Sequence, residues 1–219
     1  MFAPKLVIFD CDGVLIDSEH LACVAETRVF RRFGIDMADD FIVSHCIDLS
    51  WASSLKLIET HFNWTAPADC VAAVHAETEA VFERELTAIA GISDLLDRLT
   101  CARCVASSSS PERLQHSLGL AGLYDRLAPH IFSATMVSHG KPAPDLFLHA
   151  AREMGVSPQD CVVIEDSIAG VTAAKSAGMP VIGFIGGSHA RPDLAARLHT
   201  AGASSVVGDM KEVASLLGV

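Results

Sequence analysis

Leu6-Val7-Ile8-Phe9-Asp10-Cys11-Asp12-Gly13 joins an uninterrupted apolar run to two carboxylates and a glycine. A continuous run of this kind is typical of a strand that is buried on both faces of a parallel sheet. Further runs rich in Val and Ile occupy residues 104–106, 161–164 and 181–185, with helix-like stretches between and after them. This alternation predicts an α/β fold with a doubly wound parallel sheet.

The alternation is interrupted once, between about residues 18 and 84, where successive helical patterns occur without a buried strand. We therefore predict an α/β core domain formed by residues 1–17 and 86–219, and an inserted helical domain formed by residues 18–85. Because the insert follows the first strand, we expect it to lie over the mouth of the sheet.

The composition favours a globular protein without a nucleic-acid or membrane partner. Half of the 219 residues are hydrophobic, enough for one large core and a smaller second domain. The net charge of −11 argues against a surface that tracks nucleic acid or an anionic membrane. The N-terminal residues lack the apolar region of a signal peptide, and no apolar run is long enough to cross a bilayer. We expect a cytoplasmic protein, with a monomer favoured.

The seven cysteines are an odd set without the spacing of a disulfide framework, as expected for reduced thiols in a cytosol. Cys101 and Cys104 form a CxxC pair, for which a redox or zinc role is the alternative. Such a role needs a helix N-terminus or a second ligand pair, and neither is evident in the sequence. We interpret the cysteines as small core residues.

Two pairs of acidic residues follow predicted strands, at the edge where an open α/β sheet binds its ligands. Asp10 and Asp12 are separated by one residue, which places both carboxylates on the same side of an extended backbone. Close carboxylates favour a cation, and Glu165 with Asp166 adds oxygen ligands from another strand end. Oxygen ligands of this hard type suit Mg²⁺. We predict a magnesium site formed by Asp10, Asp12, Glu165 and Asp166.

The same residue types favour phosphoryl transfer. With a metal ion beside it, a carboxylate can attack phosphorus and form an aspartyl phosphate, which makes Asp10 the candidate nucleophile. Asp12 can protonate the departing alkoxide and later take a proton from water. Lys141, in a Gly-Lys-Pro segment ahead of a predicted helix, can offset charge on the transferring group. The predicted catalytic residues are Asp10, Asp12, Ser107 and Lys141, and the predicted phosphate-binding residues are Cys11, Asp12, Ser107, Ser108 and Lys141.

Each motif also has an ordinary structural explanation. A DxD pair often forms a turn or a cap, a serine run is commonly a loop, and Gly-Lys-Pro commonly starts a helix. The occurrence of all of them at strand ends or helix starts favours the functional interpretation.

Residues 9–19, Phe-Asp-Cys-Asp-Gly-Val-Leu-Ile-Asp-Ser-Glu, resemble the first motif of the haloacid dehalogenase superfamily. Ser107, Lys141 and Glu165-Asp166-Ser167 resemble its second, third and fourth motifs. The likeness spans almost the whole chain, and the insert resembles the helical cap of the β-phosphoglucomutase-like branch. The resemblance implies a Rossmann-like core with a cap and the roles already described for Asp10 and Asp12. It also implies Mg²⁺ held by Asp10, the Asp12 backbone carbonyl and Asp166, with direct ligation by Glu165 left open.

Three activities of this superfamily compete: phosphatase, phosphomutase and dehalogenase. Halide leaves unprotonated and without metal, so Asp12 and the second acidic pair count against a dehalogenase. Phosphomutases of the branch carry a histidine four residues after the serine of the Asp17-Ser18 step, and this chain has Ala22 there. We therefore predict a magnesium-dependent phosphatase, a phosphoric monoester hydrolase. A phosphomutase and a non-catalytic protein that binds a phosphorylated ligand are the alternatives.

The substrate class is predicted only broadly, as a small phosphorylated metabolite that is a sugar or sugar-acid phosphate. The stretch of residues 85–106 resembles sugar-phosphate phosphatases of the branch, including those acting on 6-phosphogluconate.

Overall fold

The computed structural model describes residues 4–46, 49 and 51–219, and the chain divides into two compact units. The α/β unit consists of Met1–Asp17 and Thr87–Val219, and the helical unit is Ser18–Leu86. The helices of the helical unit are α1 (Glu19–Arg32), α2 (Phe41–His45), α3 (Trp51–Phe62) and α4 (Cys70–Glu85). The strands of the α/β unit are β1 (Leu6–Phe9), β2 (Ala102–Ser107), β3 (Ile131–Ser133), β4 (Cys161–Glu165), β5 (Val181–Phe184) and β6 (Ser205–Val207). Its helices are α5 (Ile92–Arg98), α6 (Pro111–Leu120), α7 (Tyr124–Leu127), η1 (Ala134–Met136), α8 (Asp145–Glu153), η2 (Pro158–Asp160), α9 (Ile168–Ser176), α10 (Leu194–Ala201) and α11 (Met210–Leu217).

Within the described residues, six strands form one parallel sheet in the order β3-β2-β1-β4-β5-β6. Strand β1 lies in its middle, and all of its residues are completely buried, which explains the uninterrupted apolar run. Phe9 is in register with Val105 of β2 and Ile164 of β4. The residues that follow these three strands therefore meet at one edge of the sheet.

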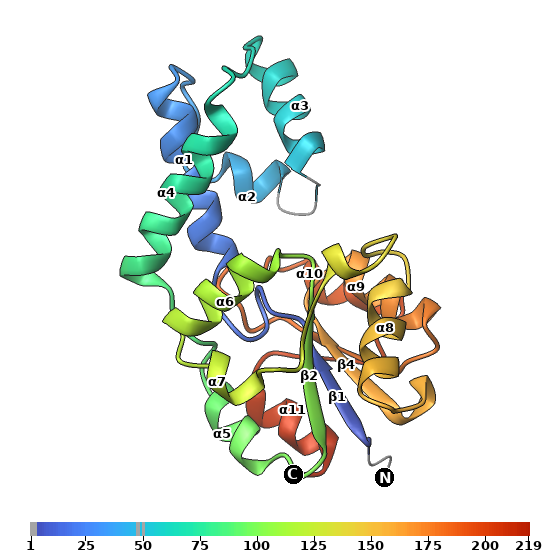
Figure 1. The fold of residues 1–219 in the computed structure, drawn as a ribbon. Coiled ribbons are helices and arrows are strands. Elements are labelled where there is room, and N and C mark those ends of the chain that lie inside the picture. Colours follow the sequence, from blue (N-terminus) through green and yellow to red (C-terminus); the bar gives the residue numbers. More distant parts are fainter. Residues whose placement is uncertain (1–3, 47–48, 50) are drawn as a thin grey trace. The chain divides into compact units, whose positions relative to one another are not determined.

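Helices cover both faces of the sheet. Leu6 and Ile8 of β1 belong to a buried cluster that also contains Phe147 of α8. Val7 and Phe9 alternate with them and are equally buried, so the opposite face is also covered. Figure 1 shows α8 and α9 on one side of the sheet and α5, α7 and α11 on the other. The predicted doubly wound parallel α/β fold is confirmed.

The sequence analysis missed the two edge strands of the sheet, β3 and β6. Each is only three residues long. Ile131 at the start of β3, and Ser205 and Val206 in β6, are only partly buried. Strands this short at a sheet edge lack the long apolar run that identifies the central strands.

The helical unit has its own apolar core. Phe30 of α1 is completely buried, stacks on Trp51 of α3 and meets the ring of Trp64 edge-on. Phe41 of α2 contacts the ring of His61. These aromatic contacts form part of the apolar core of the unit. Among the described residues, no helix combines the length and apolar character that a membrane-spanning segment requires.

Candidate active site

The turn after β1 brings acidic residues from two strands together. The Asp10 N–H donates to the carbonyl of Ile164 at 3.0 Å, which continues the pairing of β1 with β4 beyond the strand end. Gly13 has a φ of +74°, and a Cβ at this position would lie 1.9 Å from Oδ2 of Asp166. Glycine alone satisfies both the positive φ and the close approach. The glycine of the first motif therefore makes room for the carboxylate from β4.

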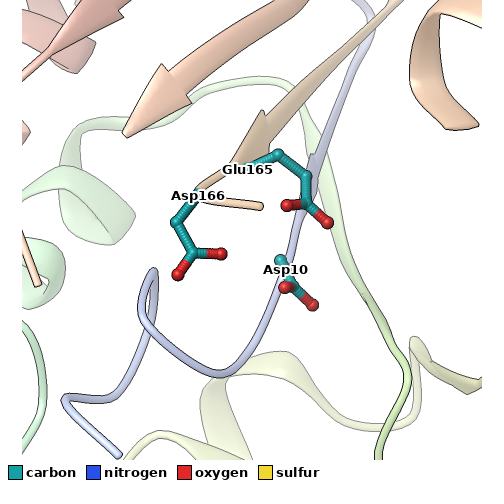
Figure 2. Close-up of side chains that lie close together, drawn as sticks. All are labelled: Asp10, Glu165 and Asp166. Carbon is teal, nitrogen blue, oxygen red and sulfur yellow. The ribbon is translucent and has the colours of Figure 1, made fainter. Parts of the chain in front are cut away.

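Asp10, Glu165 and Asp166 each contribute a carboxylate oxygen to one cluster, in which these atoms lie within 4.8 Å of one another. Figure 2 shows the three side chains converging from the ends of β1 and β4. All three residues are buried, Glu165 completely. Buried carboxylates this close repel one another and favour a compensating positive charge. The donor set fits a hard divalent cation that prefers oxygen ligands.

Burial raises the pKa of both Asp10 and Asp166 well above the ordinary carboxyl value. For Asp10, the Lys141 ammonium acts in the opposite direction, and the neighbouring carboxylates of Glu165 and Asp166 raise the pKa further. For Asp166, Glu165 raises the pKa and Lys141 lowers it. One ammonium group therefore does not neutralise the cluster. This electrostatic setting favours binding of a cation.

Lys141 connects two of the three acids from the loop that precedes α8. Its Nζ lies 2.9 Å from Oδ1 of Asp10 and 2.6 Å from Oε1 of Glu165. Burial by itself lowers the pKa of Lys141, but Asp10 and Glu165 more than offset this effect, so the pKa lies above its ordinary value. Lys141 is therefore a fixed positive charge beside Asp10. The structure brings together these predicted residues although they are far apart in the sequence.

Glu165 is held through both of its carboxylate oxygens. Oε1 accepts a hydrogen bond from Lys141, and Oε2 accepts from the N–H and the hydroxyl of Ser167, each at 2.9 Å. A Cβ at Gly170 would lie 1.7 Å from Oε1 of Glu165, so glycine in α9 leaves the space that this side chain occupies. The contacts fit a carboxylate that orients Lys141. Direct metal ligation by Glu165 stays a prediction.

The Asp12 carboxylate is engaged outside the three-carboxylate cluster. Its Oδ2 accepts a hydrogen bond from the hydroxyl of Ser109 at 2.8 Å, and its Oδ1 lies 3.9 Å from Nη2 of Arg113 in α6. Two residues that the sequence analysis did not single out therefore contact the predicted acid and base. Ser109 could have been proposed from the serine run, but the run does not show which serine faces Asp12.

The remaining predicted phosphate-binding residues lie at the ends of β1 and β2. Ser107 is almost completely buried, and its Oγ accepts from the N–H of Ser109 at 3.1 Å. Ser108 is exposed. Cys11 is completely buried, and burial raises the pKa of its thiol, with Asp12 and Asp10 contributing in the same direction. Cys11 is therefore a neutral side chain, and only its backbone N–H stays a predicted contact to phosphate.

His189 is a further site residue that the sequence analysis missed. Its Nε2 lies 3.0 Å from Oδ2 of Asp166, and both side chains are nearly fully buried. A signal was present, because His189 lies in the loop after β5, at the edge of the sheet where such folds bind their ligands.

Comparison with known proteins gives a consistent family assignment. The family model described as haloacid dehalogenase-like hydrolase matches residues 4–178. The 6-phosphogluconate phosphatase of Escherichia coli is 31% identical over 189 residues, which are 86% of this chain and 86% of that protein. This chain belongs to the haloacid dehalogenase-like hydrolase family.

Solved structures of the same family share the whole fold. A haloacid dehalogenase-like protein of unknown function from Agrobacterium tumefaciens is 38% identical with a TM-score of 0.90, covering 99% of this chain and 98% of that one. A candidate β-phosphoglucomutase of Thermotoga maritima is 26% identical with a TM-score of 0.81, covering 98% of each chain. The predicted family is confirmed, and with it an enzyme of the phosphoric monoester hydrolase class.

Proposed function

We propose that this chain hydrolyses a sugar or sugar-acid phosphate with Mg²⁺, through an aspartyl phosphate on Asp10. The observation that carries the proposal is the buried Asp10 carboxylate, which lies 2.9 Å from Lys141 Nζ and shares a cluster with Glu165 and Asp166. A carboxylate beside a fixed ammonium group and a cation site is suited to attack the phosphorus of an anionic ester.

The reaction divides into two half-reactions. In the first, an Asp10 oxygen forms a bond to phosphorus while the bond between phosphorus and the ester oxygen breaks. The electron pair of the broken bond leaves with the ester oxygen, and this oxygen receives a proton from Asp12. In the second, Asp12 takes a proton from water as the water oxygen attacks phosphorus, and the bond to Asp10 breaks. The hydrogen bond from Ser109 to Asp12 supports this role, because it fixes the carboxyl group that must transfer the proton.

The residues that would hold the cation are Asp10, Asp166, the backbone carbonyl of Asp12, and Glu165 if it ligates. When bound, Mg²⁺ offsets negative charge on the transferring phosphoryl group. Lys141 supplies a second positive charge, and its two carboxylate partners limit its movement. The backbone N–H groups of Cys11 and Asp12 are proposed to hold phosphate oxygens.

Water rather than a second sugar hydroxyl is proposed to resolve the aspartyl phosphate. Ala22 in α1 stands where phosphomutases of the branch carry a histidine, and a methyl side chain cannot transfer a proton. The name of the Escherichia coli relative supports a sugar acid as the alcohol part of the ester. Efficient conversion of hexose 1-phosphate to hexose 6-phosphate with a bisphosphate primer would favour a phosphomutase instead.

The role of the helical unit, the location and oligomeric state of the protein, and its partners are also proposals. The helical unit is proposed to act as a cap that controls access of water and substrate. The protein is proposed to be cytoplasmic, with a monomer favoured as its oligomeric state. Its proposed partner is the small phosphorylated substrate, and no nucleic acid or membrane is invoked.

A substrate screen tests the proposal. Phosphorylated sugars, sugar acids and nucleotides are incubated with the protein in Mg²⁺ or in EDTA, and released phosphate is measured. We expect Mg²⁺-dependent release, with sugar or sugar-acid phosphates as the preferred class. A folded protein that binds these esters without releasing phosphate would support the non-catalytic alternative. Equal release in EDTA would contradict the metal dependence.

A further inference from the structure

The loop after β5 is tied to the segment after β1. The N–H and the hydroxyl of Ser188 both donate to Oδ1 of Asp17, at 2.9 and 2.8 Å. Asp17 is itself fixed, because its N–H donates to the carbonyl of Thr87 at 3.0 Å. These contacts lie within the α/β unit. These hydrogen bonds fix the backbone position from which the side chain of the next residue, His189, extends.

The imidazole of His189 occupies a slot that two glycines leave open. A Cβ at Gly13 would lie 2.9 Å from Cε1 of His189, and a Cβ at Gly187 would lie 2.8 Å from its Nδ1. The side chain of His189 is 8% exposed, and that of Asp166 is 7% exposed. The ring is therefore enclosed, with Nε2 at 3.0 Å from Oδ2 of Asp166.

In the contacts that the structure describes, the three carboxylates of the cluster do not all have the same partner. Asp10 and Glu165 share the ammonium group of Lys141, whereas Asp166 has the imidazole of His189. Burial and repulsion disfavour the charged form of such a carboxylate, and a hydrogen bond donated to it favours the charged form. Carboxylates that ligate metal ions are commonly held in this way by a donor behind them.

We propose that His189 is a positioning residue for the cation site. Its Nε2–H donates to Oδ2 of Asp166 and orients the carboxylate so that the other oxygen faces Asp10 and Glu165. The pair formed by Asp17 and Ser188 keeps the imidazole in place. This inference rests on the proposed function, because it assumes that Asp166 holds a divalent cation.

Binding of Mn²⁺ without substrate tests the proposal, with the electron paramagnetic resonance signal of free Mn²⁺ as the readout. His189→Ala removes the donor, and we expect about 10–100-fold weaker Mn²⁺ binding. His189→Gln keeps an amide N–H near the position of Nε2, and we expect it to restore most of the affinity. His116→Ala changes an exposed histidine of α6 and serves as the matched control, with unchanged binding. Circular dichroism establishes that each variant is folded.

Two results would overturn the proposal. One is Mn²⁺ affinity in folded His189→Ala within about twofold of the unchanged protein. The other is a folded His189→Gln that binds as weakly as His189→Ala, which would mean that the ring fills space and its N–H contributes nothing. Failure of the proposed function looks different. In that case the unchanged protein releases no phosphate from any ester, while its Mn²⁺ affinity and the effect of His189→Ala are still measurable.

Discussion

Both units of the molecule bury an apolar core, but among the described residues the α/β unit also buries a cluster of three carboxylates. In the α/β unit, the strand ends bury Asp10, Glu165 and Asp166 together, an arrangement that disfavours folding unless a cation offsets it. In the helical unit, Phe30 and Trp51 pack in an apolar core that stabilises the unit itself. Among the described residues, the only cluster suited to a metal ion lies in the α/β unit. The α/β unit therefore combines an apolar core with the candidate site, whereas the aromatic core of the helical unit stabilises that unit alone.

Asp12→Ala gives the largest expected effect among variants that leave the cation site intact. Turnover should fall about 10²–10⁴-fold, because the proton donor and acceptor is removed. Mn²⁺ affinity should change little, since the Asp12 carboxylate contacts Ser109 and lies outside the three-carboxylate cluster. Phosphate release and Mn²⁺ titration measure the two properties. A loss of metal affinity as large as that of Asp166→Ala would contradict the assignment.

Phe30→Ala tests whether the helical unit can be destabilised without loss of cation binding by the α/β unit. Removing this fully buried ring should destabilise the helical unit by about 3–5 kcal/mol. Both tryptophans, Trp51 and Trp64, lie in that unit, so tryptophan fluorescence during urea unfolding reports on it. Mn²⁺ binding by the α/β unit should be retained. Leu146→Ala, at a fully buried position in α8, is the control that should weaken the α/β unit instead. Loss of Mn²⁺ binding in Phe30→Ala would show that the units are not separable in this way.

Asp166→Asn is expected to stabilise the metal-free protein, because it removes one of three mutually repelling buried carboxylates. The melting temperature should rise by roughly 2–4 °C for each kcal/mol gained. Added Mg²⁺ should stabilise the unchanged protein but not the variant. Glu79→Gln, at an exposed position of α4, is the control and should leave both properties unchanged. A lower melting temperature for metal-free Asp166→Asn would contradict the account.

Burial of the Asp10 and Asp166 carboxyl groups, together with repulsion from their acidic neighbours, predicts a pH dependence. The pKa values of Asp10 and Asp166 are raised in the folded state, so the folded protein binds these protons more readily than the unfolded chain. Their contribution to stability is complete below the ordinary value of 3.8 and is lost as pH rises through the raised pKa values. Unfolding of metal-free protein at increasing pH measures this loss, which Mg²⁺ should reduce. If the stability of the metal-free protein increases with pH over this range, the prediction is wrong. Asp166→Asn, measured in parallel, is the control for the contribution of Asp166.

Asp17→Ala is expected to have the smallest effect. It removes the acceptor of both hydrogen bonds from Ser188 and leaves His189 and the cluster unchanged in sequence. The Mg²⁺ concentration for half-maximal phosphate release should rise a few-fold, with little change in kcat at saturating metal, because only the position of the His189 donor is loosened. An effect on kcat alone would argue against the role of Asp17 in positioning His189.

The sequence predicted the central strands well because their burial on both faces leaves a continuous apolar run, as in β1. The acidic residues after β1 and β4 could be placed near each other because neighbouring parallel strands end at one edge. The contacts of Lys141 could not be predicted from spacing, since they depend on how the loop before α8 folds back onto Asp10 and Glu165.

Other features depend on packing that no local pattern records. The serine run after β2 did not show that Ser109 contacts Asp12. The role of His189 depends on Gly13 and Gly187, which leave space for its ring from two different loops. The only sequence signal for His189 was its position after a predicted strand. Residues after β5, like those after β1 and β4, lie at the edge of the sheet where ligands bind.

The most direct test of the central claim is phosphate release by Asp10→Asn, measured with saturating Mg²⁺ and a chromogenic phosphate ester. The substitution keeps the size of the side chain but removes the attacking carboxylate. We predict that kcat falls by about 10⁴-fold or more while the protein stays folded. Turnover of folded Asp10→Asn within a few-fold of the unchanged protein would contradict the claim that Asp10 accepts the phosphoryl group.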